Sequence, residues 1–324
     1  MTSENTSLQV CTTPADLTAL AEKLHADGRP VALVPTMGAL HDGHMQLVRA
    51  AKQIPNAAVI VSIFVNPLQF GPNEDLDSYP RTLPEDLDLL ASEGVYAAFA
   101  PTPQDMYPDG FRTTVNPGPL STEMEGATRP GHFAGALTVC AKLFGISRAD
   151  HAFFGEKDYQ QLTLLKQMVK DLNIPVTLHP VAIRREKSGL ALSSRNRYLS
   201  DTERTLAEQL SASLRAGKDA ADKGATPREV VTVTRDYLAR YPEIEVDYVE
   251  LRDAGLRKLN DYSDEHAEVT VFTSYTDGSK ASNAYAMDFT GGDWKIHLPD
   301  DGNAGGSVKA VDNFPDDMVP LEAK

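Results

Sequence analysis

Short, almost continuously apolar runs alternate with amphipathic runs along the first half of the chain. Residues 31–35 and 58–65 are rich in β-branched side chains, which is typical of strands buried on both faces of a parallel sheet. Between them, 43–52 has the apolar spacing of a helix. Further helix and strand candidates follow in alternation at 84–93, 95–100, 133–144, 152–154, 158–172 and 176–183. The pattern predicts a Rossmann-like, doubly wound α/β sheet with its ligand at the carboxyl ends of the strands.

The order of elements changes near residue 184. Two helices and then two strands are expected there, over 202–216, 227–240, 245–251 and 268–274. The stretch 276–306 is rich in Gly, Asp, Asn and Ser and gives only weak strand signals, so we interpret it as a polar insertion or a mobile hairpin region. The sequence therefore predicts a Rossmann-like domain over 1–183. A smaller C-terminal α+β lid domain with an acidic tail is expected over 184–324.

Composition is typical of a globular protein without a membrane segment. The chain has 324 residues, of which 41% are hydrophobic, and its longest nearly apolar stretch, 57–65, is far shorter than the ~20 residues that span a bilayer. Residues 1–10 show no charged-then-apolar leader. The two cysteines, Cys11 and Cys140, lie far apart and form no C-x-x-C motif. We expect a cytoplasmic protein.

The formal net charge of -15 argues against a nucleic-acid-binding protein, which would need a basic surface. The charge is also unevenly distributed. Residues 242–324 contain 18 acidic and 7 basic side chains, whereas the first 241 residues contain 28 acidic and 24 basic ones. The first part of the chain is therefore nearly neutral and can hold an anionic ligand.

Two histidines follow the first predicted strand, in the segment Pro35-Thr36-Met37-Gly38-Ala39-Leu40-His41-Asp42-Gly43-His44. Their spacing places both imidazoles on the first turn of a helix, where backbone N–H groups favour anions and glycine lets a nucleotide approach closely. Both rings can face a triphosphate. A paired-histidine metal site is the alternative, although no third ligand is near in sequence. Incidental surface histidines are a second alternative.

A second group of polar residues occurs in 189–197, where Ser193 and Ser194 precede Arg195 and Arg197. Short hydroxyl donors beside a planar cation suit phosphate, although such a run is also common in solvated loops. Together the two segments resemble the His-Ile-Gly-His and Lys-Met-Ser-Lys-Ser signatures of the nucleotidylyl-transferase and class I aminoacyl-tRNA synthetase superfamily. That superfamily binds ATP and forms adenylates.

Two further segments carry candidate ligands for a small polar substrate. Segment 64–70 leaves the second strand and contains Gln69, while 154–162 runs from a strand through Lys157 into a helix that contains Gln161. The amides can hold hydroxyl groups and a carboxylate, and the lysine supplies a point charge for a phosphate. Taken singly, Gln161 is equally a solvated helix residue and Lys157 a surface charge.

Five motifs in order resemble the pantothenate synthetase (pantoate–β-alanine ligase) family. The similarity runs from about residue 8 to 260. The motifs are TMGALHDGH, FVNPLQF, RPGHFAGALTV, FGEKDYQQL and GLALSSRNRYLS. The resemblance implies that ATP adenylates pantoate with release of pyrophosphate, and that the amine of β-alanine then displaces AMP to give pantothenate. The protein would align the reactants and neutralise charge.

The resemblance also implies roles for individual residues. His44, His41 and Lys157 would be catalytic, with His44 either donating a proton or only binding phosphate. Gln69 would contact pantoate and β-alanine, Gln161 would hold pantoate, and Asn66 would shape the pantoate pocket. The ATP-binding residues would be Met37, Gly38, Ala39, Leu40, His41, Asp42, Gly43, His44, Gly155, Glu156, Lys157, Asp158, Leu192, Ser193, Ser194 and Arg195.

No metal site in the protein itself is expected, and Mg²⁺ would arrive with ATP. Glu85 and Asp86 are candidates for steering it, or alternatively acidic residues at a helix N-terminus. Arg129 and His132 either hold a carboxylate or only shape their loop. The family implies a homodimer. Its usual last strand resembles 310–314, which the polar stretch displaces toward the end of this chain.

Two other functions share some of these features. A different adenylate-forming enzyme or a nucleotidyltransferase would have the same histidine motif, although a tRNA synthetase would also need an RNA-binding domain and a basic face. A nonenzymatic, nucleotide-sensing regulator would bind ATP without turnover and use the acidic tail for partners. The small-molecule ligase is the function that all five motifs favour.

Overall fold

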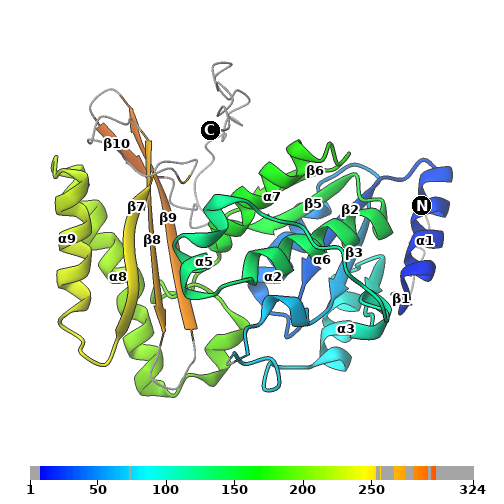
Figure 1. Ribbon diagram of the computed structural model, residues 1–324, viewed down its shortest axis with the longest axis horizontal. Helices are drawn as coiled ribbons and strands as arrows, with labels where there is room; N and C mark the ends of the chain where they lie inside the picture. The colour runs from blue at the N-terminus through cyan, green and yellow to red at the C-terminus, as the bar shows by residue number, and fades with distance from the viewer. Residues whose placement is uncertain are drawn as a thin grey trace.

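Six parallel strands form the larger sheet of the molecule (Figure 1). The computed structural model describes residues 8–72, 74–252 and 256, together with the backbone of 266–274, 280–290 and 293–296. The strand order in this sheet is β1-β4-β3-β2-β5-β6. The strands are β1 (Gln9–Cys11), β2 (Val31–Thr36), β3 (Ala58–Ile63), β4 (Ala97–Phe99), β5 (His151–Gly155) and β6 (Thr177–Val181). The predicted α/β fold class is confirmed.

The order of strands changes direction between β2 and β5. From β2 the chain adds β3 and β4 on one side, and it later returns to add β5 and β6 on the other side. The connecting helices include α2 (Asp42–Ala51), α3 (Leu83–Ser92) and α7 (Tyr159–Asp171). In doubly wound sheets, ligands bind beyond the carboxyl ends of the strands where the order reverses. The ends of β2 and β5 therefore mark the expected place of the site.

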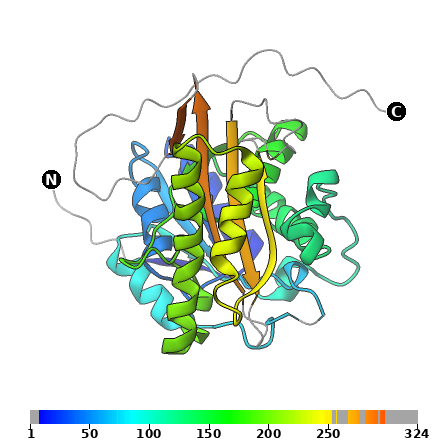
Figure 2. The ribbon, with the colours of Figure 1, turned by 90° about the vertical axis from the view of Figure 1, so that its left-hand side faces the viewer.

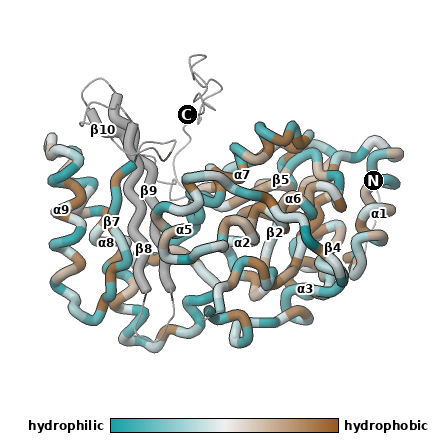
Figure 3. Tube along the Cα trace, viewed as in Figure 1, coloured by the Kyte–Doolittle hydropathy of each residue, from teal (hydrophilic) through white to brown (hydrophobic). Residues whose placement is uncertain are grey.

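Alternate residues of the central strands pack against opposite layers of helices. In β2, Val31 and Leu33 join a core with α1 (Pro14–Ala26), α6 (His132–Ser147) and α7, whereas Ala32 and Val34 join a core with α2. All four side chains are fully buried, which explains why the strand is apolar without interruption. Figure 3 shows hydrophobic stretches along both the strands and the helices of this part of the molecule.

Strand β1 and helix α1 lie outside the set that the sequence pattern predicts. Strand β1 has only three residues, two of them exposed, so it has no apolar run to detect. Helix α1 begins after Thr13, whose side chain and that of Asp16 form a reciprocal capping box. Its buried residues Leu17, Ala21 and Leu24 have helical spacing. The signals for α1 were therefore present in the sequence.

A second, four-stranded antiparallel sheet has the order β10-β9-β8-β7. Strands β7 (Glu245–Arg252) and β8 (His266–Ser274) match predicted strands. The other two, β9 (Lys280–Thr290) and β10 (Asp293–Ile296), lie in the polar stretch where the sequence gives only weak strand signals. The strand-like segment at 310–314 and the acidic tail lie outside the described residues.

Helices α8 (Asp201–Asp222) and α9 (Pro227–Leu238) cover one face of this second sheet, as Figure 2 shows. They bury a core of their own with the sheet, which includes Leu210, Leu214 and Val249. Short helical turns complete the chain between the longer elements. They are η1 (Pro67–Gln69), α4 (Pro103–Met106), η2 (Pro119–Thr122), α5 (Glu125–Thr128), η3 (Glu156–Asp158) and η4 (Ser194–Tyr198).

A buried arginine connects the two sheets. Arg252, at the end of β7, is 3% exposed and donates a hydrogen bond of 2.8 Å to the Glu123 carboxylate, beside its contact with Glu250. Glu123 precedes α5 in a segment that Gln160 of α7 holds through the carbonyls of Leu120 and Glu123, at 2.8 and 2.9 Å. The second sheet is thereby connected to the helix that follows β5.

No helix within the described residues is both long and apolar enough to cross a membrane.

Candidate functional site

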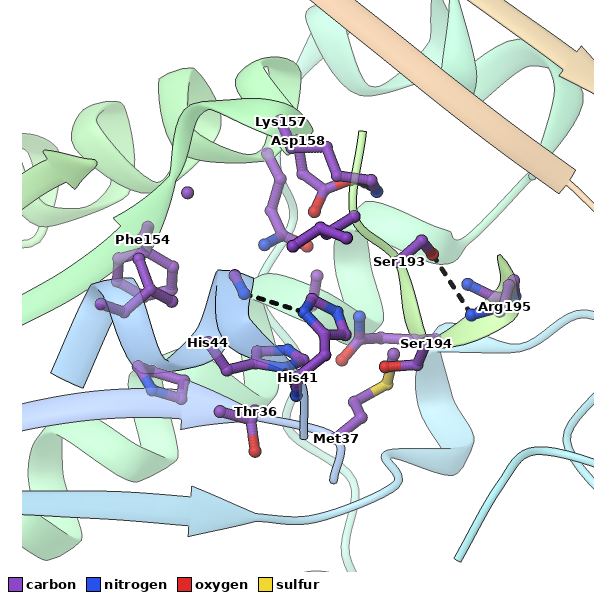
Figure 4. Close-up of a pocket in the computed structure, with 18 of the residues that line it drawn as sticks. Thr36, Met37, His41, His44, Phe154, Lys157, Asp158, Ser193, Ser194 and Arg195 are labelled. Carbon is purple, nitrogen blue, oxygen red and sulfur yellow. Dashed lines mark hydrogen bonds and ion pairs between the residues drawn. The ribbon is translucent and has the colours of Figure 1, made fainter. Parts of the chain in front are cut away.

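A pocket of about 250 Å³ opens beyond the carboxyl ends of β2 and β5. Figure 4 shows how it is built: Thr36 ends β2 and Met37 follows it, His41 and His44 lie at the start of α2, Lys157 and Asp158 follow β5, and Ser193 to Arg195 approach from a separate segment. Three of the predicted motifs, far apart in the sequence, thus contribute to one pocket. It lies where the topology of the sheet places a ligand.

Asp86 of α3 fixes the loop that carries the first motif. Its two carboxylate oxygens accept hydrogen bonds from the backbone N–H groups of Ala39 and Leu40, at 2.9 and 2.8 Å. The Gly38 N–H donates to the Thr36 hydroxyl at 3.2 Å. These three N–H groups of the loop before α2 therefore have partners within the protein. The prediction that backbone N–H groups favour an anion concerned the first turn of α2 itself.

The position of Asp86 is the one that the helix N-terminus alternative expects. Asp86 lies in the first turn of α3, is 3% exposed and receives a third hydrogen bond from the Thr82 hydroxyl at 3.3 Å. Its carboxylate also braces the loop, which gives it a structural task that needs no magnesium. Glu85 is exposed and does not line the pocket. The bracing contact joins residues more than 40 positions apart, which sequence spacing does not reveal.

The hydrogen bonds of His41 and His44 determine where each ring carries its proton. The Gly43 N–H donates to Nδ1 of His41 at 3.1 Å, and the His41 N–H donates to Nδ1 of His44 at 3.3 Å. Since Nδ1 accepts in both neutral rings, Nε2 carries the proton in both. The ring centroids lie 4.1 Å apart. The pair therefore has two N–H groups left for a ligand.

Both rings are neutral at physiological pH. Burial, helped by the Lys157 ammonium, lowers the pKa of His41 to about 4. Burial, followed by the proximity of His41, lowers the pKa of His44 to about 3. A Cβ on Gly43 would lie 2.8 Å from the His41 ring, so glycine is required for the ring to fold over the helix start. Close packing thus creates the neutral pair.

Lys157 and Gln161 extend the pocket on the β5 side. Lys157 is in η3, its Nζ lies 3.3 Å from the Asp158 carboxylate, and its side chain is 24% exposed. Gln161, in the first turn of α7, lines the pocket, and its amide makes no hydrogen bond to another described residue. The neighbouring Gln160 is buried and holds the segment before α5. Adjacent glutamines therefore have separate tasks.

The segment 193–195 is docked onto the histidine loop. The Ser194 hydroxyl donates to the Ala39 carbonyl at 3.0 Å, and the Ser193 hydroxyl accepts from the Arg195 N–H at 3.3 Å. Arg195 donates through Nε and Nη2 to both oxygens of Asp75, at 2.9 Å each. Its guanidinium lies 5.3 Å from the centre of the Tyr79 ring. Asp75, which the sequence reasoning did not single out, thus orients the predicted phosphate ligand.

Arg129 and His132 form the wall behind Gln69. Arg129 is 9% exposed and its guanidinium pairs with Glu74 and Glu125, so it has no free charge for a substrate carboxylate. Arg129 Nη2 and His132 Nδ1 both donate to the Gln69 carbonyl, at 3.3 and 2.9 Å. Burial, followed by the Arg129 charge, lowers the pKa of His132 to about 4. The loop-shaping alternative is the one that the geometry favours.

One wall of the pocket is apolar, and the sequence predicted no binding role for its residues. It consists of side chains from β5, α6 and the end of β3, and their apolar helix and strand patterns were the available signal. The residues are Phe64, Ala136, Val139, Cys140, Leu143 and Phe154. Burial raises the pKa of the Cys140 thiol to about 12, so the thiol stays neutral. This wall suits an aliphatic substrate group.

Most of the predicted ligands line the pocket and a minority do not. Those that line it are Met37, His41, Gly43, His44, Gln69, Gly155, Lys157, Asp158, Gln161, Leu192, Ser193, Ser194 and Arg195. Those outside the lining set are Gly38, Ala39, Leu40, Asp42, Asn66 and Glu156. Asp42, for example, turns outward to Arg49 and Arg184, at 2.9 and 3.1 Å.

Among the described residues, no group of three or more His, Cys, Asp and Glu side chains is placed to hold a metal ion. Two imidazoles alone do not complete the three or four protein ligands of a zinc site. The pair His41–His44 is therefore better suited to an anion than to a cation.

The sequence of this chain is similar to those of known proteins. The model of the pantoate–β-alanine ligase family matches residues 9–280. Pantothenate synthetase of Mycolicibacterium smegmatis is 59% identical over 249 residues, which are 77% of this chain and 79% of that protein. The enzyme of Mycolicibacterium paratuberculosis is 60% identical over 249 residues, covering 77% of this chain and 80% of that protein.

Solved structures agree with the sequence comparisons. Pantothenate synthetase of Thermus thermophilus is 41% identical, with a TM-score of 0.79, over 86% of this chain and 98% of that chain. The pantoate–β-alanine ligase of Francisella tularensis, solved with β,γ-ATP and β-alanine, is 33% identical, with a TM-score of 0.70, over 86% of this chain and 97% of that chain. The chain therefore belongs to the pantoate–β-alanine ligase family.

Proposed function

We propose that this protein is an AMP-forming ligase that joins (R)-pantoate to β-alanine through a pantoyl-adenylate intermediate. The observation that carries the proposal is the convergence of His41, His44, Lys157 and Arg195 on one pocket, which the amides of Gln69 and Gln161 also line. Cationic groups, ring N–H groups and neutral amides are thus available to one ligand. Family membership supports the same assignment.

In the first step, a carboxylate oxygen of pantoate attacks the α-phosphorus of ATP and pyrophosphate leaves. The Nε2–H groups of His41 and His44 and the Lys157 ammonium would stabilise negative charge that grows on the phosphate oxygens. Because both rings are neutral in the free pocket, they would act as hydrogen-bond donors rather than as imidazolium acids. Ser193, Ser194 and Leu192 would close over the phosphates.

In the second step, the amine of β-alanine attacks the acyl carbon of the adenylate, AMP leaves with the electrons of the acyl–oxygen bond, and the nitrogen releases a proton to solvent. A mixed anhydride makes AMP a good leaving group, so the protein's task is mainly alignment. Gln69 and Gln161 would hold the pantoyl and β-alanine groups, and Asn66 would support Gln69 from behind. The apolar wall of Val139 and Leu143 would exclude water from the anhydride.

Mg²⁺ would enter as part of the ATP substrate. The described residues offer no cluster of protein ligands for a resident ion, and Mg²⁺ commonly binds substrate phosphates through most of its coordination sites. The proposal also includes location in the cytoplasm and assembly as a homodimer. It further includes division of the chain into two domains, over 1–183 and 184–324. The separate cores of the two sheets support that division.

A pyrophosphate-release assay tests the proposal. With pantoate, β-alanine and Mg-ATP, the protein should release AMP and pyrophosphate in equal amounts and form an amide product. Without β-alanine, pyrophosphate release should stop after about one turnover, and exchange of labelled pyrophosphate into ATP should depend on pantoate. Release of ADP contradicts the proposal. A product that retains AMP indicates a nucleotidyltransferase, and ATP binding without turnover indicates a nucleotide sensor.

A further inference from the structure

We propose that Tyr107 is a positioning residue of this site, whose hydroxyl fixes the amide of Asn66 and thereby makes Gln69 present its N–H groups to the substrate. The inference rests on the proposed function, because it concerns how Gln69 meets pantoate and β-alanine. Tyr107 directly follows α4 and is remote in sequence from every motif of the pocket. The side chains of Tyr107, Asn66 and Gln69 form a chain of hydrogen bonds. The donor and acceptor atoms in it can be assigned from their partners.

Two backbone groups show which end of the Asn66 amide is oxygen and which is nitrogen. Asn66 is 1% exposed; its Oδ1 accepts from the Leu68 N–H at 3.3 Å, and its Nδ2 donates to the Gly135 carbonyl at 3.1 Å. A backbone N–H can only donate and a backbone carbonyl can only accept. The two ends of the Asn66 amide therefore cannot be exchanged without losing both bonds.

The orientation of Asn66 determines that of Gln69. The second N–H of Asn66 Nδ2 donates to Oε1 of Gln69 at 3.0 Å. The oxygen of Gln69 consequently faces Asn66, and Nε2 is the end available to a ligand. Nε2 makes no hydrogen bond to another described residue, and Gln69 lines the pocket. A substrate oxygen in the pocket can therefore accept the hydrogen bond that Nε2 offers.

Tyr107 supplies the remaining donor to Asn66. Its hydroxyl lies 2.7 Å from Asn66 Oδ1, the shortest hydrogen bond of this amide. Its ring is held by Phe64 and Phe111, with centroid distances of 6.1 and 4.9 Å. Burial, and to a smaller extent the neighbouring Cys140, raises the pKa of Tyr107. The hydroxyl therefore stays protonated. It acts as the donor to Asn66 Oδ1, because that oxygen can only accept.

The backbone holds this group of residues rigid. A Cβ on Gly135 would lie 2.0 Å from the Leu68 carbonyl, so glycine at this position lets α6 press against the turn that carries Asn66 and Gln69. The Gln69 carbonyl is held in turn by Arg129 and His132. With the backbone fixed from both sides, the remaining freedom of Gln69 is rotation of its amide, which is what the Tyr107–Asn66 contact restricts.

The test compares Tyr107→Phe with Tyr96→Phe, which removes a hydroxyl whose partner is Gln9 at the far edge of the sheet. In Tyr107→Phe we expect kcat/KM for pantoate to fall by about 5- to 30-fold, as for the loss of one buried hydrogen bond of about 1–2 kcal/mol. The KM for ATP should change by less than about twofold, since the histidine side of the pocket is untouched. Tyr96→Phe should match the wild type.

Two further variants separate positioning from folding. Phe111→Leu disturbs the packing of the Tyr107 ring but keeps its hydroxyl, so it should retain pantoate kinetics. Asn66→Asp cannot donate to Gln69 Oε1 and should turn that amide around, with a loss of pantoate kcat/KM on the order of 10² or more. A uniform loss for all substrates in Tyr107→Phe, or losses equal to those of Phe111→Leu, overturns the positioning role. Absence of pantoate-dependent AMP release in the wild type overturns the proposed function instead.

Discussion

The two pocket histidines lie where a charged substrate would bind, but their rings are uncharged. Each ring accepts a backbone hydrogen bond at Nδ1, so each has one N–H for a phosphate oxygen. A cationic ring at this place would lie beside Lys157 and a second ring, in a partly desolvated pocket. Neutral donors can therefore stabilise a triphosphate without like-charge repulsion before ATP arrives.

The pH behaviour of these rings is the first prediction. In NMR titration of histidine-labelled protein, His41 and His44 should change protonation near pH 4 and pH 3, because burial holds their pKa values at about 4 and about 3. ATP should raise both midpoints, since the triphosphate favours the imidazolium form. Variants His41→Asn and His44→Asn assign the signals. Midpoints near the ordinary value of about 6.5 contradict the proposed neutral pair.

The same shifts affect stability in a defined direction. An unfolded histidine binds a proton near pH 6.5, whereas these folded rings bind one only near pH 4 and pH 3. Between these pH values the unfolded state binds more protons than the folded state. The free energy of unfolding should therefore fall as pH falls from about 6.5 to about 4. In urea unfolding, the free energy of unfolding should differ less between pH 7 and pH 5 for His44→Asn than for the wild type.

Lys157 allows a test of charge at a single position. Replacing Lys157 by alanine should lower kcat by a factor on the order of 10² to 10³, the usual loss for one charge-stabilising group. Lys166→Ala is the matched control, because Lys166 lies exposed on the adjoining helix α7. Initial rates of pyrophosphate release measure both. Near-wild-type turnover of Lys157→Ala removes this residue from the proposed mechanism.

At the scale of elements, α3 acts on the pocket through one side chain. Asp86 accepts from two successive backbone N–H groups of the histidine loop and so fixes a loop in which Ala39 has a positive φ of 49°. The rest of α3 faces the core or solvent. The pattern of apolar residues predicts this helix, and one of its polar side chains also shapes the site.

Asp86→Asn should destabilise the protein by about 1–3 kcal/mol, because its NH₂ group would face one of two backbone donors. The KM for ATP should rise, while the dependence of the rate on Mg²⁺ should stay unchanged. Asp88→Asn, exposed on the same helix, is the control. Urea unfolding and magnesium titrations of the rate provide the readouts. A shift in the magnesium dependence of Asp86→Asn alone would restore the steering role.

The predictable part of the fold follows from local pattern. Strands 31–35 and 58–65 are recognisable because both of their faces are buried, and α7 because its apolar residues have one helical period. Strand β1 has no such pattern, and β9 carries polar residues although it pairs with β8 along nine positions. Motif residues could be predicted because the resemblance supplies them. Contacts such as Asp86 to Ala39, Asp75 to Arg195 and Tyr107 to Asn66 are tertiary, so neither periodicity nor spacing contains them.

At the scale of the whole molecule, the pocket draws on segments that belong to different parts of the chain. The histidines and Lys157 flank the parallel sheet, while 193–195 lie just before α8. Arg252 joins the second sheet to the segment held by Gln160. ATP bound among these groups would therefore connect both parts and stabilise them together.

Arg252→Met should lower the free energy of unfolding by about 1–3 kcal/mol, less than for a fully buried pair because Glu123 is 33% exposed. Arg240→Met, exposed on the surface after α9, should be near neutral. Mg-ATP at about 100 times its Kd should add about 2.7 kcal/mol to the wild type. Equal unfolding midpoints for the two arginine variants contradict the connecting role.

The strand order also has a consequence for how the protein is made. Strand β1 pairs with β4, with Gln9 opposite Ala97, and β2 finds its second neighbour only in β5, with Ala32 opposite His151. A chain that emerges from the ribosome amino end first thus exposes the histidine segment long before its neighbours exist. Residues 193–195 emerge later still. The binding pocket is therefore incomplete until Arg195 has emerged, so a shorter nascent chain lacks part of its lining.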